Sequence, residues 1–290
     1  MIPSAFEYLR PTSLAEATRL LARHADEAKV LAGGHSLVPL MKLRLSRPSM
    51  LIDIGRLGEL RGIHEENGTI VIGACTTHYV AESSALLLQR CPLLAETAAA
   101  IGDVQVRNCG TIGGSIVHAD PAADWPAAMV ALNAQFTLAS SKGTRTVSAS
   151  EFFVDMLITA MQNDEILTEI RVPSNPPHTG SAYLKVAQPA SGFALTGVAA
   201  QVTLGADHRV QQVTVGITGV SSKAFRASAT ENALRGQAAT AEAITQAAAH
   251  AADGVEALDA DIHASPEYRL HLARVYTKRA LLQAAERAGG

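Results

Sequence analysis

Two glycine-rich segments, about eighty residues apart, place the strongest constraint on how this chain can fold. The first reads Ala32-Gly33-Gly34-His35-Ser36-Leu37 and follows Val30-Leu31; the second reads Thr111-Ile112-Gly113-Gly114-Ser115. Because glycine has no Cβ, a Gly-Gly step can take a positive φ and expose its N–H groups. A single step of this kind would be only a tight turn. Two of them facing each other would hold the two phosphates of a dinucleotide.

The residues before position 56 predict a small βαβ-like unit. Ser13 and Glu16 form a capping box that begins a helix, and 29–31 and 50–54 have the apolar composition of strands. The first glycine segment follows the helix instead of preceding it, and the chain has no G-x-G-x-x-G sequence. This order excludes a Rossmann-type start.

Two further zones follow along the chain. The second, about 56–176, opens with a hairpin around Asn67-Gly68, a type I′ turn signal. It continues with helices near 93–101 and 124–132, a hairpin over 135–147 and a strand over 166–172, and it ends in a Pro-rich linker. The third zone predicts strands at 182–185, 194–204 and 210–218 and then helices at 227–234, 241–252 and 266–287. Strands followed by helices indicate an α+β arrangement.

Composition narrows the possible functions. With 24 basic and 27 acidic residues the net charge is −3, which gives no attraction to nucleic acid. No apolar run reaches the eighteen residues that a membrane span needs, and the start lacks a signal-peptide layout, so we expect a soluble, cytoplasmic chain. Cys75, Cys91 and Cys109 include no C-x-x-C pair, so we expect no metal or iron–sulphur cluster in this chain.

Several motifs resemble one family. The motifs are the start Ile2-Pro3 with Phe6, Tyr8 and Pro11, the first glycine segment followed by Pro39-Leu40-Met41-Lys42, and the stretch from Gln105-Val106-Arg107-Asn108 to Ser115. Together they resemble the FAD-binding medium subunit of the molybdenum hydroxylases. This is the xanthine dehydrogenase and aerobic carbon monoxide dehydrogenase family. The resemblance continues through Ala119-Asp120-Pro121 and Glu165-Ile166-Leu167 and so covers nearly the whole chain. It implies a two-part FAD domain of the vanillyl-alcohol-oxidase/p-cresol-methylhydroxylase type over 1–176, divided near 55, and a smaller α+β domain over 177–290.

The resemblance also assigns cofactor contacts. The diphosphate would be bound by the two glycine segments, whose implied site residues are Leu31, Ala32, Gly33, Gly34, His35, Ser36, Leu37, Thr111, Ile112, Gly113, Gly114, Ser115 and Ala119. In the first segment the backbone N–H groups of Gly33 to Ser36 and the Ser36 hydroxyl are the expected donors.

Contacts outside the two segments follow from the same resemblance. It implies that Asp124 binds a ribose or ribityl hydroxyl, that Ile101 and Leu167 pack on the adenine or flavin, and that Phe193 covers the flavin. Lys185 would lie near the flavin ring, where a positive charge favours the anionic reduced form. Without the resemblance, Lys185 would be interpreted as a surface lysine and Asp124 as a helix N-cap.

Partners follow from the resemblance as well. A large subunit with the molybdenum cofactor would hydroxylate the substrate, and a small subunit with two [2Fe–2S] clusters would pass electrons to FAD in this chain and on to an external acceptor. We expect a dimer of such heterotrimers. Their contact surface would lie near Arg107, Asn108 and 187–193.

Departures from the family pattern leave the substrate open. The stretch from Lys185 to Phe193 lacks the basic residues expected of carbon monoxide dehydrogenases, which favours an organic substrate such as an N-heterocycle or an aldehyde. The chain also lacks the cysteine-rich insertion of the branch that reduces aromatic acyl-CoA thioesters. Two alternatives remain, a free-standing FAD oxidoreductase with its own small substrate and a flavin-less assembly subunit. For the first, His35 and His118 are the candidate acid/base groups, although turn roles suit both better.

Overall fold

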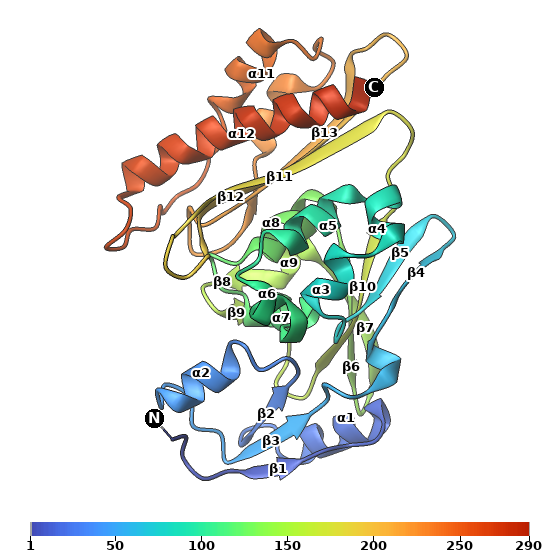
Figure 1. Cartoon of the computed structure of the whole chain (residues 1–290), viewed down its shortest axis with the longest axis vertical. Helices are drawn as coiled ribbons and strands as arrows, with labels where there is room; N and C mark the ends of the chain where they lie inside the picture. Colours follow the sequence, from blue (N-terminus) through green and yellow to red (C-terminus); the bar gives the residue numbers. More distant parts are fainter. Residues whose placement is uncertain (1, 290) are drawn as a thin grey trace.

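The computed structural model describes residues 2–289 and has three tiers along its long axis (Figure 1). The N-terminal tier is a parallel three-stranded sheet in the order β1-β3-β2. Its elements are β1 (Glu7–Leu9), α1 (Leu14–Arg23), β2 (Ala28–Leu31), α2 (Leu37–Lys42), β3 (Met50–Asp53) and the short 3-10 helix η1 (Gly58–Leu60). Ser13 caps α1 by accepting from the Glu16 N–H, as predicted, but the Glu16 carboxylate accepts from Thr12 and not from Ser13, so the capping box forms only in part. The βαβ-like interpretation is therefore correct, with β1 as an additional strand.

The middle tier is built on an antiparallel sheet in the order β4-β5-β10-β6-β7. Its strands are β4 (Ile63–Glu66), β5 (Thr69–Gly73), β6 (Gln135–Ser140), β7 (Gly143–Ser148) and β10 (Ile166–Pro173), beside the small hairpin β8 (Phe153–Asp155) and β9 (Ile158–Thr159). Seven helices accompany this sheet: α3 (His78–Glu82), α4 (Ala85–Arg90), α5 (Pro92–Ala99), α6 (Val104–Cys109), α7 (Ile112–His118), α8 (Asp124–Ala131) and α9 (Ala149–Phe152). Asn67 and Gly68 both have positive φ, 50° and 76°, as the predicted type I′ turn requires.

The C-terminal tier is an antiparallel sheet in the order β11-β12-β13-β14. It consists of β11 (Thr179–Ala187), β12 (Ala194–Leu204), β13 (Val210–Thr218), β14 (Phe225–Arg226), α10 (Ser228–Leu234), α11 (Ala241–Ala248) and α12 (Pro266–Gly289). The expected boundary near residue 176 falls in the loop between β10 and β11. The α+β class, with a two-part N-terminal region and a smaller C-terminal domain, is confirmed.

The C-terminal sheet is covered on both faces. Helix α12 packs against β11 and β12 on one face, so closely that a Cβ on Gly180 would meet the backbone of α12. Helix α8 packs against β12 and β13 from the middle tier. Tyr183 and Ala199 accordingly belong to the core of the middle tier, whereas Ala182 and Val198 belong to the core under α12. The two tiers therefore share an apolar interface through alternate residues of the same strands.

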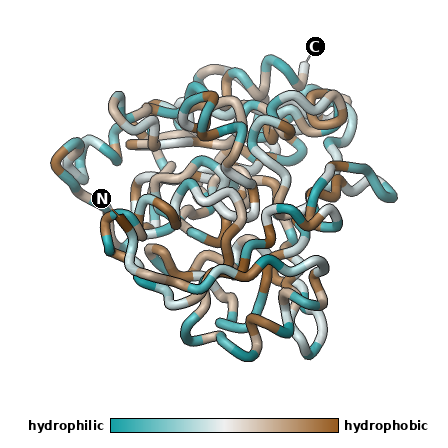
Figure 2. Tube along the Cα trace, turned by 60° about the horizontal axis from the view of Figure 1, so that its bottom comes forward, coloured by the Kyte–Doolittle hydropathy of each residue, from teal (hydrophilic) through white to brown (hydrophobic). Residues whose placement is uncertain are grey.

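Hydrophobic segments run through the inside of the trace, whereas the outer loops are mostly hydrophilic (Figure 2). Trp125, Phe136 and Phe152 are the largest fully buried side chains of the middle tier. Among residues 2–289, we find no helix with the length and apolar character that crossing a membrane requires.

Candidate functional site

The first glycine segment touches the backbone that leads directly into the second. Gly33, two residues after the end of β2, lies against the backbone of Cys109 and Gly110, which immediately precede the second segment. A Cβ placed on Gly33 would lie 2.8 Å from the Gly110 Cα and closer still to the Cys109 carbonyl oxygen. The sequence expectation that the segments face each other is thus met by direct backbone contact between the first tier and the second.

The first glycine segment presents free backbone donors. Within residues 2–289, no oxygen accepts a hydrogen bond from the N–H groups of Gly33, Gly34, His35, Ser36 and Leu37. Gly34 has φ +74°, and Ser36, which precedes the first residue of α2, is in the right-handed helical region. Apart from the exposed His35, the segment is half-buried. These free donors fit the diphosphate of a dinucleotide.

The second glycine segment differs from its prediction. It forms the start of α7 and not a turn, and neither Gly113 nor Gly114 has a positive φ. Thr111 is the N-cap, and its hydroxyl accepts from the Gly114 N–H at 3.1 Å. The expectation of positive φ is therefore wrong here, and also at Gly33, because a capped helix and close packing set these conformations.

Most amides of this second segment already have partners. The Gly113 N–H donates to the Ala74 oxygen at 2.9 Å and the Ser115 N–H donates to the Thr111 oxygen at 3.1 Å. Gly113 is required for space, since a Cβ there would lie 2.6 Å from the Ala74 Cβ. What remains open to a ligand is the exposed Gly114 and the half-buried Ser115. The second segment therefore offers a ligand an open surface and the Ser115 hydroxyl, and few free N–H donors.

A buried histidine lies behind the contact between the two segments. His78 is 4% exposed, and its Nδ1 accepts from the Trp125 Nε1–H at 3.1 Å. The backbone N–H of His78 donates to the Gly110 oxygen at 3.0 Å. Burial, together with the positive charges of the nearby His35 and Arg107, lowers the pKa of His78 from 6.5 to about 4. Neither His78 nor Trp125 was identified from the sequence, although Trp125 is the only tryptophan of the chain.

A second cluster joins the middle and C-terminal tiers at Asp124. The Asp124 carboxylate accepts from the Tyr183 hydroxyl at 2.6 Å and from Lys185 Nζ at 3.0 Å. Lys185 also donates to the Gly192 oxygen at 2.7 Å. Asp124 is the first residue of α8 and makes no capping bond, and the Lys185 side chain is only 10% exposed. The N-cap and surface-lysine interpretations are therefore both wrong.

Burial governs the titration of this cluster. It raises the pKa of Asp124, and the Lys185 charge and the Tyr183 hydroxyl offset that rise in part. Burial also raises the pKa of Tyr183 well above 10.0, with the Asp124 charge adding to the effect. The positive charge of Lys185 is thus balanced within the protein, and Asp124 already has two partners.

The remaining predicted residues divide into two groups. Near the Asp124 cluster, the hairpin that contains Phe193 rests on the loop after Ile101, since a Cβ on Gly192 would lie 3.3 Å from the Gly102 Cα. Phe193 is 44% exposed and Ile101 is half-buried, so both present surface there. The other group is buried in the core of the middle tier, with little surface for a ring: Ile112, Ala119 and Leu167 are 0%, 4% and 3% exposed. Their assignment as contacts stays a prediction.

A half-buried ion pair lies at the predicted partner surface. Arg107 donates to Glu82 at 2.7 Å and to the Ile101 oxygen at 3.1 Å. The Asn108 side chain donates to the Val104 oxygen at 2.7 Å. Arg107 thus links α6 to α3, whereas Asn108 is exposed, and the predicted contact surface stays a prediction.

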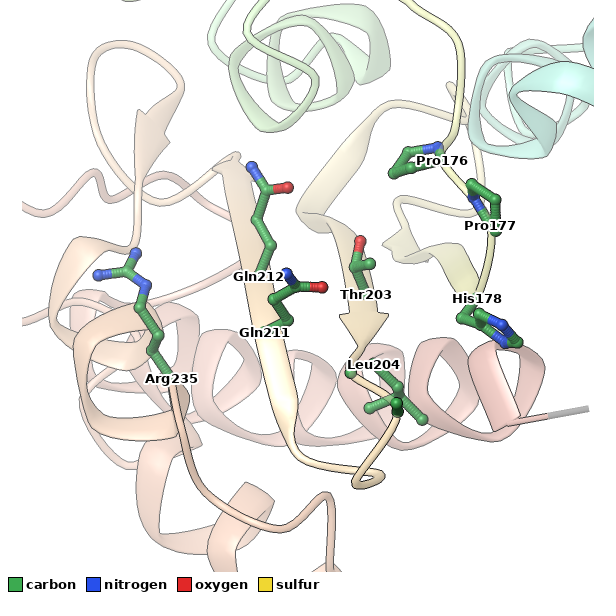
Figure 3. Close-up of a pocket in the computed structure, with 10 residues that line it drawn as sticks. Pro176, Pro177, His178, Thr203, Leu204, Gln211, Gln212 and Arg235 are labelled. Atoms are coloured by element: carbon green, nitrogen blue, oxygen red, sulfur yellow. The ribbon is translucent and has the colours of Figure 1, made fainter.

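A hollow in the C-terminal tier lies apart from these residues (Figure 3). It is lined by Pro176, Pro177 and His178 on one side and by Gln211, Gln212 and Arg235 on the other, with Thr203 and Leu204 between them (Figure 3). It contains none of the predicted site residues. We therefore assign it no role in cofactor binding.

Known proteins match the chain over nearly its full length. Residues 4–175 match the model described as the FAD binding domain in molybdopterin dehydrogenase, and 181–284 match that of the CO dehydrogenase flavoprotein C-terminal domain. The carbon monoxide dehydrogenase medium chain of Hydrogenophaga pseudoflava is 43% identical over 97% of both chains. The 6-hydroxypseudooxynicotine dehydrogenase complex subunit alpha of Paenarthrobacter nicotinovorans is 38% identical over 99% of this chain and 97% of its own.

A solved structure agrees with these matches. A chain of carbon monoxide dehydrogenase from Hydrogenophaga pseudoflava, in a form that lacks the Mo-pyranopterin moiety of its cofactor, superimposes with a TM-score of 0.95 at 44% identity. The match covers 99% of each chain.

Proposed function

The chain belongs to the FAD-binding medium subunits of the molybdenum hydroxylases, and we propose that it carries electrons from the iron–sulphur clusters of a partner subunit to an external acceptor. The observation that carries this proposal is the set of free amides at Gly33 to Leu37 beside the contact with Cys109 and Gly110. An FAD diphosphate supplies the anionic oxygens that these donors require.

Each part of the site has a proposed task. The first glycine segment binds the diphosphate, and Ser115 adds a hydroxyl from the start of α7. Ile101 and Phe193 cover the flavin end, near Lys185 and Asp124. FAD, when bound, supplies a redox centre that exchanges electrons with the clusters and with the acceptor. The Lys185–Asp124 pair keeps the charge near that end fixed and close to neutral, because both groups are buried together.

The substrate chemistry is proposed to lie in a partner. Asp124 binds both Tyr183 and Lys185, so neither the carboxylate nor the lysine of this cluster is free for acid/base work. This arrangement supports an electron-transfer subunit over a free-standing oxidoreductase. We propose that a large molybdenum subunit and a small iron–sulphur subunit complete the enzyme, as a dimer of heterotrimers, and that its substrate is organic. The names of the relatives include both carbon monoxide and an organic substrate.

We expect FAD to be bound without a covalent bond. His35 is the one residue of the first segment whose type forms flavin bonds, and its place between free amides suits a backbone donor. Precipitation of the yellow protein with trichloroacetic acid should leave the colour in the supernatant. Colour that remains in the washed pellet would contradict this prediction.

The isolated chain should bind FAD without being reduced by substrate. Residues 2–289 contain no group of side chains that could hold a metal cluster to supply electrons, so a panel of N-heterocycles and aldehydes should leave the flavin absorbance unchanged. Addition of the molybdenum and iron–sulphur partners should then allow one of these compounds to bleach the flavin. Bleaching of the isolated chain would favour the free-standing oxidoreductase, and failure to bind FAD at all would favour the assembly subunit.

A further inference from the structure

His78 occupies the space directly behind the contact between the two glycine segments. A Cβ on Gly110 would lie 2.9 Å from His78 Nε2, and a Cβ on Gly33 would lie 2.8 Å from the Gly110 Cα. The ring of His78, the backbone of Gly110 and the backbone of Gly33 are therefore stacked in contact. The backbone N–H of His78 also donates to the Gly110 oxygen, and Thr77 forms an isolated β-bridge with Thr111.

Trp125 determines the proton arrangement of the His78 ring. Because the Trp125 Nε1–H can only donate, Nδ1 of His78 must be unprotonated, and the neutral ring carries its proton on Nε2. Within residues 2–289, no oxygen accepts a hydrogen bond from this Nε2. The hydrogen bond from Trp125 joins α3 to α8, so the ring connects the second glycine segment with the helix that begins at Asp124.

The charged groups around His78 oppose its protonation. His35 from the first segment and Arg107 from α6 both act on the ring as positive neighbours. Glu82, on the same helix as His78, is paired with Arg107. Glu96 of α5 accepts from the Tyr183 N–H and from Arg287, and Asp124 of α8 is bound to Tyr183 and Lys185. These three carboxylates, Glu82, Glu96 and Asp124, are therefore engaged with other partners.

We propose that His78 is a positioning residue of the cofactor site, whose neutral ring, fixed by Trp125, holds the second glycine segment against the first at the separation that the FAD diphosphate requires. The inference rests on the proposed function. Loss of the ring leaves space into which Gly110 can move. Protonation of the ring removes the Nδ1 acceptor and places a buried charge beside Arg107, and both changes disturb the contact with Gly33.

The decisive experiment is an FAD titration of the whole chain, prepared free of cofactor, at pH 7.5. We expect His78→Ala to weaken FAD binding by about tenfold or more, which corresponds to the loss of one supporting hydrogen bond and its packing. His78→Gln keeps an acceptor for Trp125 and most of the volume, so its affinity should stay within about threefold of the native chain. Phe152→Leu, a substitution at a fully buried residue of the same core, is the matched control and should bind FAD normally.

A pH series separates positioning from general stability. In the native chain FAD affinity should fall only near pH 4, and Trp125 fluorescence of the cofactor-free chain should fall over the same range because an imidazolium quenches indole. In Trp125→Phe the neutral His78 ring loses the hydrogen bond that stabilises it, so the pKa of His78 rises. The fall of FAD affinity in acid should then occur about half to one pH unit higher. In His78→Gln both acid transitions should disappear. Circular dichroism at each pH shows whether the fold is retained.

The outcomes discriminate between the two proposals. If the native chain binds FAD, and His78→Ala and Trp125→Phe bind it as tightly as Phe152→Leu across the pH range, the positioning role is overturned while the proposed function stands. If His78→Ala does not fold, the pH series of the other two variants is the test. Acid transitions in His78→Gln and Trp125→Phe that match those of the native chain overturn the positioning role. A native chain that binds no FAD overturns both proposals.

Discussion

Replacing Gly33 by valine is expected to abolish FAD binding while leaving the secondary structure intact. A Cβ at this position would meet the Cys109 carbonyl and lie 2.8 Å from the Gly110 Cα. Both are backbone atoms, which cannot rotate away as a flexible side chain would, so the two glycine segments must separate. Loss of two charge-assisted hydrogen bonds to the diphosphate would weaken FAD binding by about 100-fold or more.

The matched control for this substitution is Gly58→Val. Gly58 also has an ordinary φ, and nothing lies within 4 Å of the position that a Cβ would take. The ratio of flavin to protein absorbance after purification, followed by FAD titration of the cofactor-free chain, measures the effect. If Gly33→Val retains as much FAD as Gly58→Val, the contact between the segments has no part in cofactor binding.

The elements that local patterns encode could be predicted closely. Strands β12 and β13 have the predicted bounds, because each is a long apolar run that ends at a turn. Helices α1 and α8 begin at the expected residues, and the Asn67-Gly68 hairpin has the expected backbone conformation. In each case the signal lies within a few residues of the element.

Short elements that depend on distant partners could not be predicted. Strand β1 has three residues and exists because it pairs with β3, more than forty residues later. Helices α3 and α6 have five and six residues, too few to be stable alone, and they pack against each other. In α7, the Thr111 cap starts a helix in spite of the glycines that follow it. Gly114 therefore has an ordinary helical φ, and a side chain there would cause no positive-φ strain.

The site could be located from the sequence, but its pairings could not be derived. The glycine segments and the family resemblance placed the cofactor, whereas the Trp125–His78 bond spans 47 residues and the Lys185–Asp124 bond spans 61. Such contacts depend on how the tiers pack, which no local pattern encodes. The same packing explains why Asp124 and Lys185, interpreted separately from the sequence, are bound to each other.

Breaking that pair is expected to destabilise the protein more than any exposed ion pair would. In Asp124→Asn the Lys185 ammonium stays 90% buried without a counter-charge, and we expect a loss of about 3–5 kcal/mol in the free energy of unfolding. Because Asp124 lies on α8 and Lys185 on β11, the loss includes the contact between the middle and C-terminal tiers. Urea unfolding of the cofactor-free chain measures it. Asp164→Asn breaks the exposed pair with Lys142 and should cost no more than about 1 kcal/mol.

The complementary variant, Lys185→Met, should regain stability as the pH falls. Without Lys185, burial raises the pKa of Asp124 further above its ordinary value, so the folded state holds a proton that the unfolded chain releases. Stability therefore decreases as the pH rises from about 4 through the folded pKa, and acidification reverses the loss. The double variant Asp124→Asn/Lys185→Met buries no charge and should lose less than either single variant. Additive losses, with no recovery of Lys185→Met in acid, would show that the two residues do not act as a buried pair.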